Sequence, residues 1–398
     1  MGISYKTWVE IDTGVLRANL GLLREAVGPD CQTILVVKSD AYGHGAHTVA
    51  SVAAEEGIRR FAVASVSEGV ALRKMAVPGE IIILHPVMEF EVEAAIRDRL
   101  SPTVSDFTLA KTLSDHVRNT LGIQVEVNTG INRLGLDWKS AAEVITRIAA
   151  LPNIRIEGVF THFRASGDAG NGSVSTQMAR FQGILEALRK RNIDIGLTHA
   201  ASSHAVARYR SSHLDGVRPG MIIYAGVGES EASNAKPPDP IISPLGRMRG
   251  VMRAYSRVLM TRSVAAGEWI HYGDAFQAPR DMEVAVIAIG YGMGYPRSLS
   301  NNADMLLAGR RVPVVGVIGM DMTIVAIDGL PRILPGDIAT IMGTDGDETI
   351  TIHEVARRAG TIPYEIACRL GNALPRVVKE TETADKPKAL SVSRNAVS

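Results

Sequence analysis

The sequence alternates short apolar runs with helical patterns between residues 34 and 224, and this alternation limits the folds that the chain can adopt. The apolar runs are short and rich in Val and Ile, which is typical of buried parallel strands. They cover residues 34–37, 61–64, 81–84, 102–104, 123–127, 154–160, 195–199 and 216–224. Helical patterns lie between them, at residues 46–56, 66–75, 89–99, 107–119, 140–150 and 175–191. Eight strands alternating with helices over about 220 residues predict an α/β fold, a (β/α)8 barrel of the TIM type.

The pattern changes after residues 229–240, a polar and proline-rich stretch that we interpret as a linker. Beyond it, one clear helical pattern at residues 352–359 stands among short runs that predict a mainly β domain. These runs cover residues 257–264, 284–289, 312–317, 323–327 and 338–342. We therefore divide the chain into a barrel at 12–238, a β domain at 239–380 that includes the strand in 1–11, and a disordered tail at 381–398.

Charge and composition exclude several classes of partner. Lys and Arg number 43 against 42 Asp and Glu, so nothing favours nucleic acid or an anionic membrane. The N-terminus lacks an apolar signal core, and no run is long enough to cross a bilayer. Only Cys31 and Cys368 are present, which gives neither a disulfide framework nor metal-ligand spacing. We expect a cytoplasmic protein that contains no metal. Its ligand should be a small polar or zwitterionic molecule.

The strand at residues 34–37 leads directly into Lys38 and a loop that contains Gly43 and Gly45. Ligands bind at the carboxyl ends of the strands in α/β barrels. A lysine partly removed from water there has a lowered pKa, so its neutral amine can attack a carbonyl group and form a Schiff base. Taken alone, Lys38 is better interpreted as a salt-bridging residue at the barrel mouth.

Other predicted strand ends carry polar side chains that would share this rim. They are Tyr42, Arg133, His162, Ser202, Ser203 and Arg218. An amine, two guanidiniums, an imidazole and small hydroxyls suit an aromatic cofactor that carries a phosphate and an aldehyde.

Four further motifs have simpler interpretations. Residues 290–294 lack the helix that a phosphate loop needs, so we expect a turn, and residues 345–348 predict a hairpin rather than a calcium loop. Asn171 forms a glycosylation sequon by chance. His44 and His47 without a third ligand make a weak metal site.

From about Trp8 to Val378 the sequence resembles the alanine racemases, pyridoxal-phosphate enzymes of fold type III. The most specific match is to the family's cofactor-lysine signature, in Val36-Val-Lys-Ser-Asp-Ala-Tyr-Gly-His-Gly. Later matches follow in the same order: Asn132-Arg-Leu-Gly, Thr161-His-Phe, His199-Ala-Ala-Ser-Ser, Val217-Arg-Pro-Gly, His271-Tyr-Gly-Asp, Gly290-Tyr-Gly, Gly319-Met-Asp and Ile362-Pro-Tyr-Glu-Ile. The resemblance implies racemisation of L-alanine and D-alanine with pyridoxal 5'-phosphate, by a homodimer with shared active sites that supplies D-alanine for peptidoglycan.

The resemblance also implies a two-base mechanism. Lys38 would bind the cofactor and move the α-proton on one face, and Tyr272 of the partner subunit would serve the other face. His162 and Arg218 would supply positive charge that favours the Tyr272 phenolate. Arg218 would face the pyridine nitrogen, where a group that never deprotonates suppresses transamination. Without the resemblance, Tyr272 is better interpreted as a packed interface tyrosine, and Arg218 could also pair with Asp215 or Glu157.

The remaining roles that the resemblance implies concern binding. The phosphate would be held by Tyr42, Ser203, Tyr364 and the backbone N–H groups of Gly220 and Met221. Arg133 would face the cofactor's phenolic oxygen and the substrate carboxylate. The Met320 N–H would also hold that carboxylate, and Tyr291 would lie at the entrance.

Three positions depart from the family pattern. Many members have a carbamylated lysine seven residues before the arginine, where this chain has Glu126, which either supplies the same charge or only pairs with a barrel cation. Gly319 replaces a cysteine and Ser202 replaces an asparagine. These changes leave open a racemase of broader specificity, for example for serine. A fold-type III decarboxylase and a non-catalytic pyridoxal-phosphate carrier are more distant alternatives.

Overall fold

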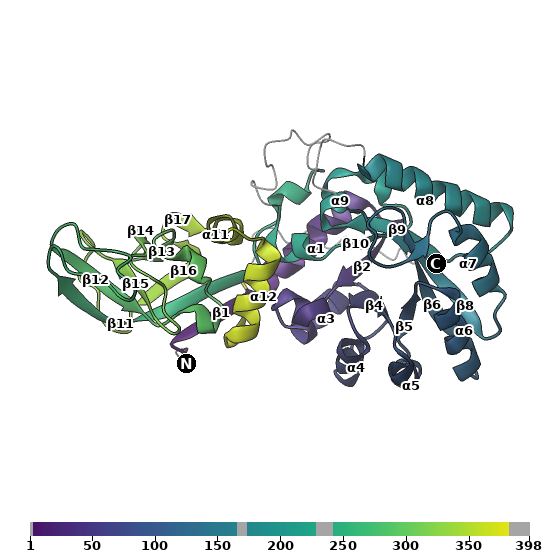
Figure 1. The fold of residues 1–398 in the computed structure, drawn as a ribbon, viewed down its shortest axis with the longest axis horizontal. Helices are drawn as coiled ribbons and strands as arrows, with labels where there is room; N and C mark the ends of the chain where they lie inside the picture. The colour runs from purple at the N-terminus through teal and green to yellow at the C-terminus, as the bar shows by residue number, and fades with distance from the viewer. Residues whose placement is uncertain (1–2, 165–172, 228–241, 382–398) are drawn as a thin grey trace, which may run out of the picture.

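The computed structural model describes residues 3–164, 173–227 and 242–381, which form a barrel and a strand-rich domain (Figure 1). The barrel lies at one end of the molecule and the strand-rich domain at the other (Figure 1). The predicted boundary at residues 238 and 239, the linker, Asn171 and the tail beyond residue 381 lie outside the described residues. No helix among the described residues has the length and apolar character needed to cross a membrane.

Parallel strands form a closed ring in the barrel. They are β2 (Gln32–Val36), β3 (Arg60–Val63), β4 (Glu80–Pro86), β5 (Ser101–Val104), β6 (Leu121–Asn128), β8 (Ile154–Thr161), β9 (Leu197–Ser202) and β10 (Gly216–Arg218). β10 pairs with β2 and β5 pairs with β6, so the ring has no free edge. A short strand, β7 (Leu136–Asp137), adds to β6 outside the ring. The predicted (β/α)8 barrel is confirmed.

Helices alternate with the strands along the chain and cover the ring (Figure 1). They are α1 (Thr13–Val27), α3 (Ala46–Glu55), α4 (Val66–Lys74), α5 (Val92–Arg97), α6 (Phe107–His116), α7 (Ala141–Ala149), α8 (Ser173–Lys190), α9 (Ser203–Arg208) and α10 (Met221–Ala225). The Asp12 carboxylate caps α1 by accepting a hydrogen bond from the Val15 N–H at 3.1 Å.

One predicted strand is wrong in its second half. The run at residues 216–224 is a strand only to Arg218, and helix α10 begins at Met221. Pro219 lacks the N–H that a central strand needs, and Gly220 turns the backbone. Hydrophobicity gave no signal of this change because both segments are buried.

The strand-rich domain contains mainly antiparallel pairs. Its strands are β1 (Thr7–Asp12), β11 (Met252–Val264), β12 (Met282–Ile287), β13 (Asp304–Leu307), β14 (Arg310–Pro313), β15 (Thr323–Ala326), β16 (Ile338–Asp345), β17 (Glu348–Ile350) and β18 (Arg376–Lys379). β1 pairs with both β11 and β18, so the N-terminal strand completes a sheet built by the C-terminal residues. β16 and β17 form the hairpin predicted at residues 345–348, and the 290–294 motif is a turn with a short 3₁₀ segment, also as predicted.

The expectation of a single helix in this domain is wrong. α11 (Ile352–Ala359) was predicted, but α12 (Pro363–Ala373) follows it and packs where the domain meets the barrel. Its signal was present, because Pro363 at the first turn and buried Ile366 and Leu370 four residues apart are typical of a helix start and an apolar stripe.

Candidate active site

Lys38 lies just beyond β2, and the four residues that follow it form a left-handed backbone turn. Ser39, Asp40, Ala41 and Tyr42 have φ angles of 53°, 53°, 52° and 54°, in the left-handed region that costs non-glycine residues ~1–2 kcal/mol each. The surrounding structure holds this turn, because the Asp40 carboxylate accepts from the Ala46 N–H at 2.6 Å and pairs with Arg376 at 2.6 Å. The segment labelled α2 (Lys38–Tyr42) is therefore a strained support for the lysine rather than an ordinary helix.

The ammonium group of Lys38 is disfavoured in this position. Burial lowers the pKa of Lys38, and the nearby Arg133 charge lowers it further, while Glu68 acts in the opposite direction. Glu68 also accepts from the Ser39 N–H at 2.7 Å. The environment thus favours the neutral amine that nucleophilic or basic chemistry needs.

One pocket gathers most of the predicted site residues. Those that line it are Lys38, Tyr42, Arg133, His162, Ser203, Arg218, Gly220 and Tyr364, together with Glu126 and Ser202. His85 also lines it, and sequence reasoning missed this residue. Its signal was a polar residue at the end of the apolar run 81–84, the same signal that identified the other rim residues.

Arg218 is buried and held by acceptors from three residues. Its Nη1 contacts His199 Nδ1 at 2.6 Å, and its Nη2 donates to the Thr161 and Ala200 carbonyls at 2.7 and 3.2 Å. Burial lowers the pKa of Arg218 to about 10, which still leaves it charged at neutral pH. The alternative pairing with Asp215 or Glu157 is wrong, because Asp215 accepts from the Thr198 N–H at 2.9 Å and Glu157 pairs with Arg155.

Glu126 places a carboxyl group among these cations. It is 3% exposed, and its charge interacts with both Arg218 and Arg133. Burial raises the pKa of Glu126, and the two guanidiniums oppose that rise. The two arginines are therefore what favours the carboxylate at this depth.

The surroundings of His162 favour a neutral imidazole, whereas the resemblance implies that this residue supplies positive charge. Burial lowers the pKa of His162 to about 3, and the charges of Arg218, Arg133 and Lys38 all contribute. Its imidazole is therefore neutral at physiological pH, and the positive charge of the pocket comes from the guanidiniums.

Hydroxyl groups and backbone amides lie together beside α10. Ser203 Oγ accepts from the Gly220 and Ile222 N–H groups at 2.9 and 3.3 Å, so the predicted Gly220 N–H already has a partner. A Cβ at position 220 would lie 2.7 Å from the Tyr42 hydroxyl, so only glycine allows this approach. The Tyr42 ring lies between Tyr224 and Tyr364, with centroids 5.4 and 5.8 Å away.

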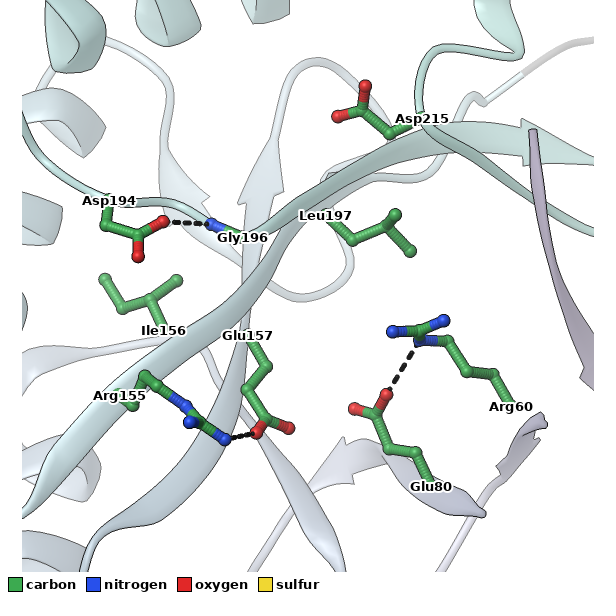
Figure 2. A pocket seen from close by; sticks show the side chains of 9 residues that line it. All are labelled: Arg60, Glu80, Arg155, Ile156, Glu157, Asp194, Gly196, Leu197 and Asp215. Carbon is green, nitrogen blue, oxygen red and sulfur yellow. Dashed lines mark hydrogen bonds and ion pairs between the residues drawn. The ribbon is translucent and has the colours of Figure 1, made fainter. Parts of the chain in front are cut away.

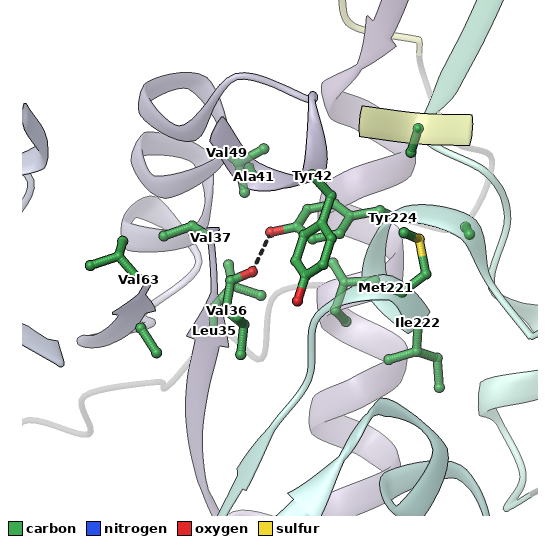
Figure 3. Packing of buried hydrophobic residues seen from close by; sticks show 14 of the residues in the cluster. Leu35, Val36, Val37, Ala41, Tyr42, Val49, Val63, Met221, Ile222 and Tyr224 are labelled. Carbon is green, nitrogen blue, oxygen red and sulfur yellow. Dashed lines mark hydrogen bonds between the residues drawn. The ribbon is translucent and has the colours of Figure 1, made fainter. Parts of the chain in front are cut away.

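Two buried residues, Tyr224 and His44, support the backbone on either side of Lys38. Tyr224 donates its hydroxyl to the Val36 carbonyl at 2.8 Å, two residues before Lys38 (Figure 3). His44 stacks on Tyr224 at 4.7 Å, and its Nδ1 contacts the Ala41 and Tyr42 carbonyls. His44 is thus a core histidine, and the described residues contain no group of three or more potential metal ligands.

The strand-rich domain holds the other predicted residues on its surface. Tyr272, Tyr291 and Met320 are 73%, 45% and 62% exposed, and none of them lines the pocket as far as the structure describes the chain. The His271 and Tyr272 rings meet edge to face at 4.5 Å. Gly319 makes room for His271, because a Cβ there would lie 2.9 Å from the imidazole. Met221, also predicted, is buried but does not line the pocket.

Comparisons with known proteins agree over nearly the whole chain. Residues 11–227 match the family model described as "Alanine racemase, N-terminal domain", and residues 251–378 match "Alanine racemase, C-terminal domain". "Alanine racemase 1" of Clostridium acetobutylicum is 34% identical over 374 residues, covering 93% of this chain and 94% of the relative.

Solved structures show the same likeness. The alanine racemase of Clostridium difficile 630 superimposes with a TM-score of 0.87 at 27% identity, over 95% of this chain and 97% of that one. The alanine racemase of Bartonella henselae with covalently bound pyridoxal phosphate does so with a TM-score of 0.81 at 27% identity, over 94% and 100%.

Proposed function

The chain belongs to the alanine racemase family of amino-acid isomerases, and from this premise we propose that it interconverts L-alanine and D-alanine by a two-base mechanism with pyridoxal 5'-phosphate at Lys38. One observation carries the proposal within this chain. A lysine with a lowered pKa and a buried, charged Arg218 line the same pocket.

The residues of the pocket fit this cofactor. The Lys38 amine would hold it covalently, and Arg218 would face the ring nitrogen. The hydroxyls of Tyr42, Ser203 and Tyr364, beside backbone amides, suit a phosphate, and Gly220 leaves space for close approach. When bound, pyridoxal phosphate withdraws electrons from the α-carbon of an attached amino acid and so makes its proton easier to remove.

The protein's own groups would then control where that proton goes. Lys38 Nζ, favoured as a neutral amine, would take or return the α-proton on one face, and Tyr272 of the partner subunit would do so on the other. Arg133 and the Met320 N–H would hold the substrate carboxylate, with Tyr291 at the entrance. Arg218 keeps its protons and cannot share one with the ring nitrogen, which favours simple return of the proton over transamination.

We propose a homodimer because Tyr272, Tyr291 and Met320, which would act on the substrate, lie on the surface of the single chain. Exposed aromatic and methionine side chains surround Tyr272 in sequence or lie on neighbouring loops. They include Trp269, Tyr291, Met320 and Met322, which are 51%, 45%, 62% and 37% exposed. A second copy of the chain, placing its pocket against these residues, would bury them and complete both sites by symmetry.

The broader-specificity racemase stays as the alternative, because Ser202, one of the positions that depart from the family pattern, lines the pocket. A visible-absorbance spectrum of the purified protein, followed by a chiral assay with L-alanine, tests the main proposal. Covalent cofactor and formation of D-alanine are expected. Faster initial rates with L-serine would favour the alternative, and no D-amino acid from any substrate would overturn both.

The cellular role is a separate proposal. A cytoplasmic source of D-alanine for peptidoglycan suits this activity, and both cysteines are free thiols, as a reducing compartment allows. Expression of the chain in a bacterium that lacks its own racemase should remove the requirement for added D-alanine. Continued dependence on D-alanine, with active protein present, would contradict this role.

A further inference from the structure

We propose that Gln124 and Glu80 are positioning residues for Arg218, which they hold through His199 by a directional chain of hydrogen bonds across the barrel interior. This inference rests on the proposed function, since Arg218 is the residue assigned to the cofactor ring. It extends that site to the opposite end of the barrel, where Glu80 and Arg60 begin strands β4 and β3.

Consecutive contacts connect the pocket to that end. Arg218 Nη1 lies 2.6 Å from His199 Nδ1, and His199 Nε2 lies 3.2 Å from Gln124 Oε1. Gln124 Nε2 then donates to Glu80 Oε1 at 2.9 Å. Arg60 Nε donates to Glu80 Oε2 at 3.0 Å and closes the chain (Figure 2).

The chemistry of these groups fixes the direction of every bond. A guanidinium has only donors, so His199 Nδ1 must accept and the imidazole proton must be on Nε2. That N–H needs an acceptor, which Gln124 Oε1 provides, and this leaves the Gln124 amide to donate to the Glu80 carboxylate. Burial and the charge of Arg218 hold the pKa of His199 well below its usual value, in agreement with a neutral ring.

Packing leaves these side chains little freedom. Gln124 and His199 are 2% and 0% exposed. The Phe160 ring stacks on His199 at 4.9 Å with an interplanar angle of 11°, and Arg218 lies 4.8 Å above the same ring. Gly158 makes room for the amide, because a Cβ there would lie 2.2 Å from Gln124 Oε1.

These hydrogen bonds determine which N–H groups of Arg218 can contact a ligand. The contacts to His199, Thr161 and Ala200 use three of its five N–H groups, and the remaining two are available to the pocket that Arg218 lines. Removal of the Gln124 acceptor leaves a buried imidazole N–H unsatisfied, which favours rotation or the other tautomer of His199. In that tautomer Nδ1 carries the proton, so it can no longer accept the hydrogen bond from Arg218.

Three variants of the holoenzyme test this inference. Gln124→Leu removes both bonds of the amide, Glu80→Leu removes the final acceptor, and Glu80→Gln keeps an oxygen acceptor. Ser114→Ala is the matched control, since Ser114 is a buried residue of α6 whose hydroxyl donates to the Pro152 carbonyl and makes no contact with this network. The measurements are the His199 tautomer from ¹⁵N-histidine spectra, the dissociation constant of pyridoxal phosphate, and the visible circular dichroism of the bound cofactor.

We expect Gln124→Leu to change the His199 tautomer, weaken cofactor binding about tenfold, which corresponds to ~1.4 kcal/mol, and reduce the dichroic band. Glu80→Leu should have the same effects in smaller measure, Glu80→Gln should restore the wild-type values, and Ser114→Ala should leave them unchanged. If Gln124→Leu does not fold, the comparison between Glu80→Leu and Glu80→Gln decides the question. A changed tautomer with unchanged cofactor binding and dichroism would overturn the inference, as would wild-type values in Glu80→Leu. Failure of the proposed function itself is distinct, because the wild-type protein would then lack the bound cofactor.

Discussion

The barrel and the strand-rich domain present their candidate residues in opposite ways. In the barrel, Glu126 and Arg218 are 3% and 4% exposed, and burial shifts the pKa of Lys38, His162 and Arg218. In the strand-rich domain, Tyr272 and Met320 are 73% and 62% exposed. The barrel thus holds its charged candidate residues in a buried pocket of one chain, whereas in the proposed dimer the exposed residues would be completed by the surface of a second copy.

The largest effect is expected from a change at Lys38, in the buried pocket of the barrel. Lys38→Ala should abolish racemisation and covalent attachment of the cofactor, because no other amine is predicted at the pocket. Borohydride reduction followed by peptide mapping checks the attachment site, with Lys190→Ala, at the exposed end of α8, as the control. Cofactor found on a different lysine in the wild-type protein would remove the basis for the site.

The exposed side is tested by mixing two inactive proteins. In a heterodimer of Lys38→Ala and Tyr272→Phe chains, a shared arrangement puts both changes in one site and leaves the other site intact. We therefore expect about half of the wild-type activity per heterodimer after dissociation and reassociation. Verified heterodimers that are as inactive as their parents would show that Tyr272 acts within its own chain or not at all.

The same division explains what the sequence could predict. Runs of Val and Ile define the barrel strands because both faces are buried, and Lys38 follows from its place after the first of them. The charge of His162 could not be predicted, because it depends on burial and on Arg218, Arg133 and Lys38, which come from other segments of the barrel. The contact of Gln124 with His199 joins residues 75 positions apart, and nothing local indicates it. A role for Tyr272 in the site of a partner subunit was expected only through the resemblance.

Acid should affect the barrel through its buried histidines. Burial lowers the pKa of His44 from 6.5 to about 4, so the neutral ring contributes stability above pH 6.5 that is lost as the pH falls towards 4. The contribution is ~3 kcal/mol from a shift of about 2.5 pKa units. His44→Gln should flatten the decline in unfolding free energy, measured by urea denaturation across this range. The exposed His116 provides the control, and an equal change in His116→Gln would assign the effect to general charge.

Since His44 contacts the carbonyls of Ala41 and Tyr42, its protonation should loosen the turn that carries Lys38. Hydrogen exchange at pH 4.5 would then show loss of protection in this turn before the β11–β12 pair of the strand-rich domain. Simultaneous loss in both regions would mean that the two domains unfold as one unit in acid.

The smallest effect is expected at Glu126, where the barrel carries a carboxylate among cations. Glu126→Gln keeps the shape but removes the charge that Arg133 and Arg218 face, which should cost ~1–3 kcal/mol of transition-state stabilisation. If the carboxylate mainly orients Arg133 towards the substrate carboxylate, KM for alanine should rise more than kcat falls. If it acts mainly on Arg218, kcat and cofactor affinity should fall while KM changes little. Glu93→Gln, an exposed change on α5, controls for loss of charge alone. Unchanged kinetics in Glu126→Gln would show that the buried carboxylate is structural and that the two arginines hold their positions without it.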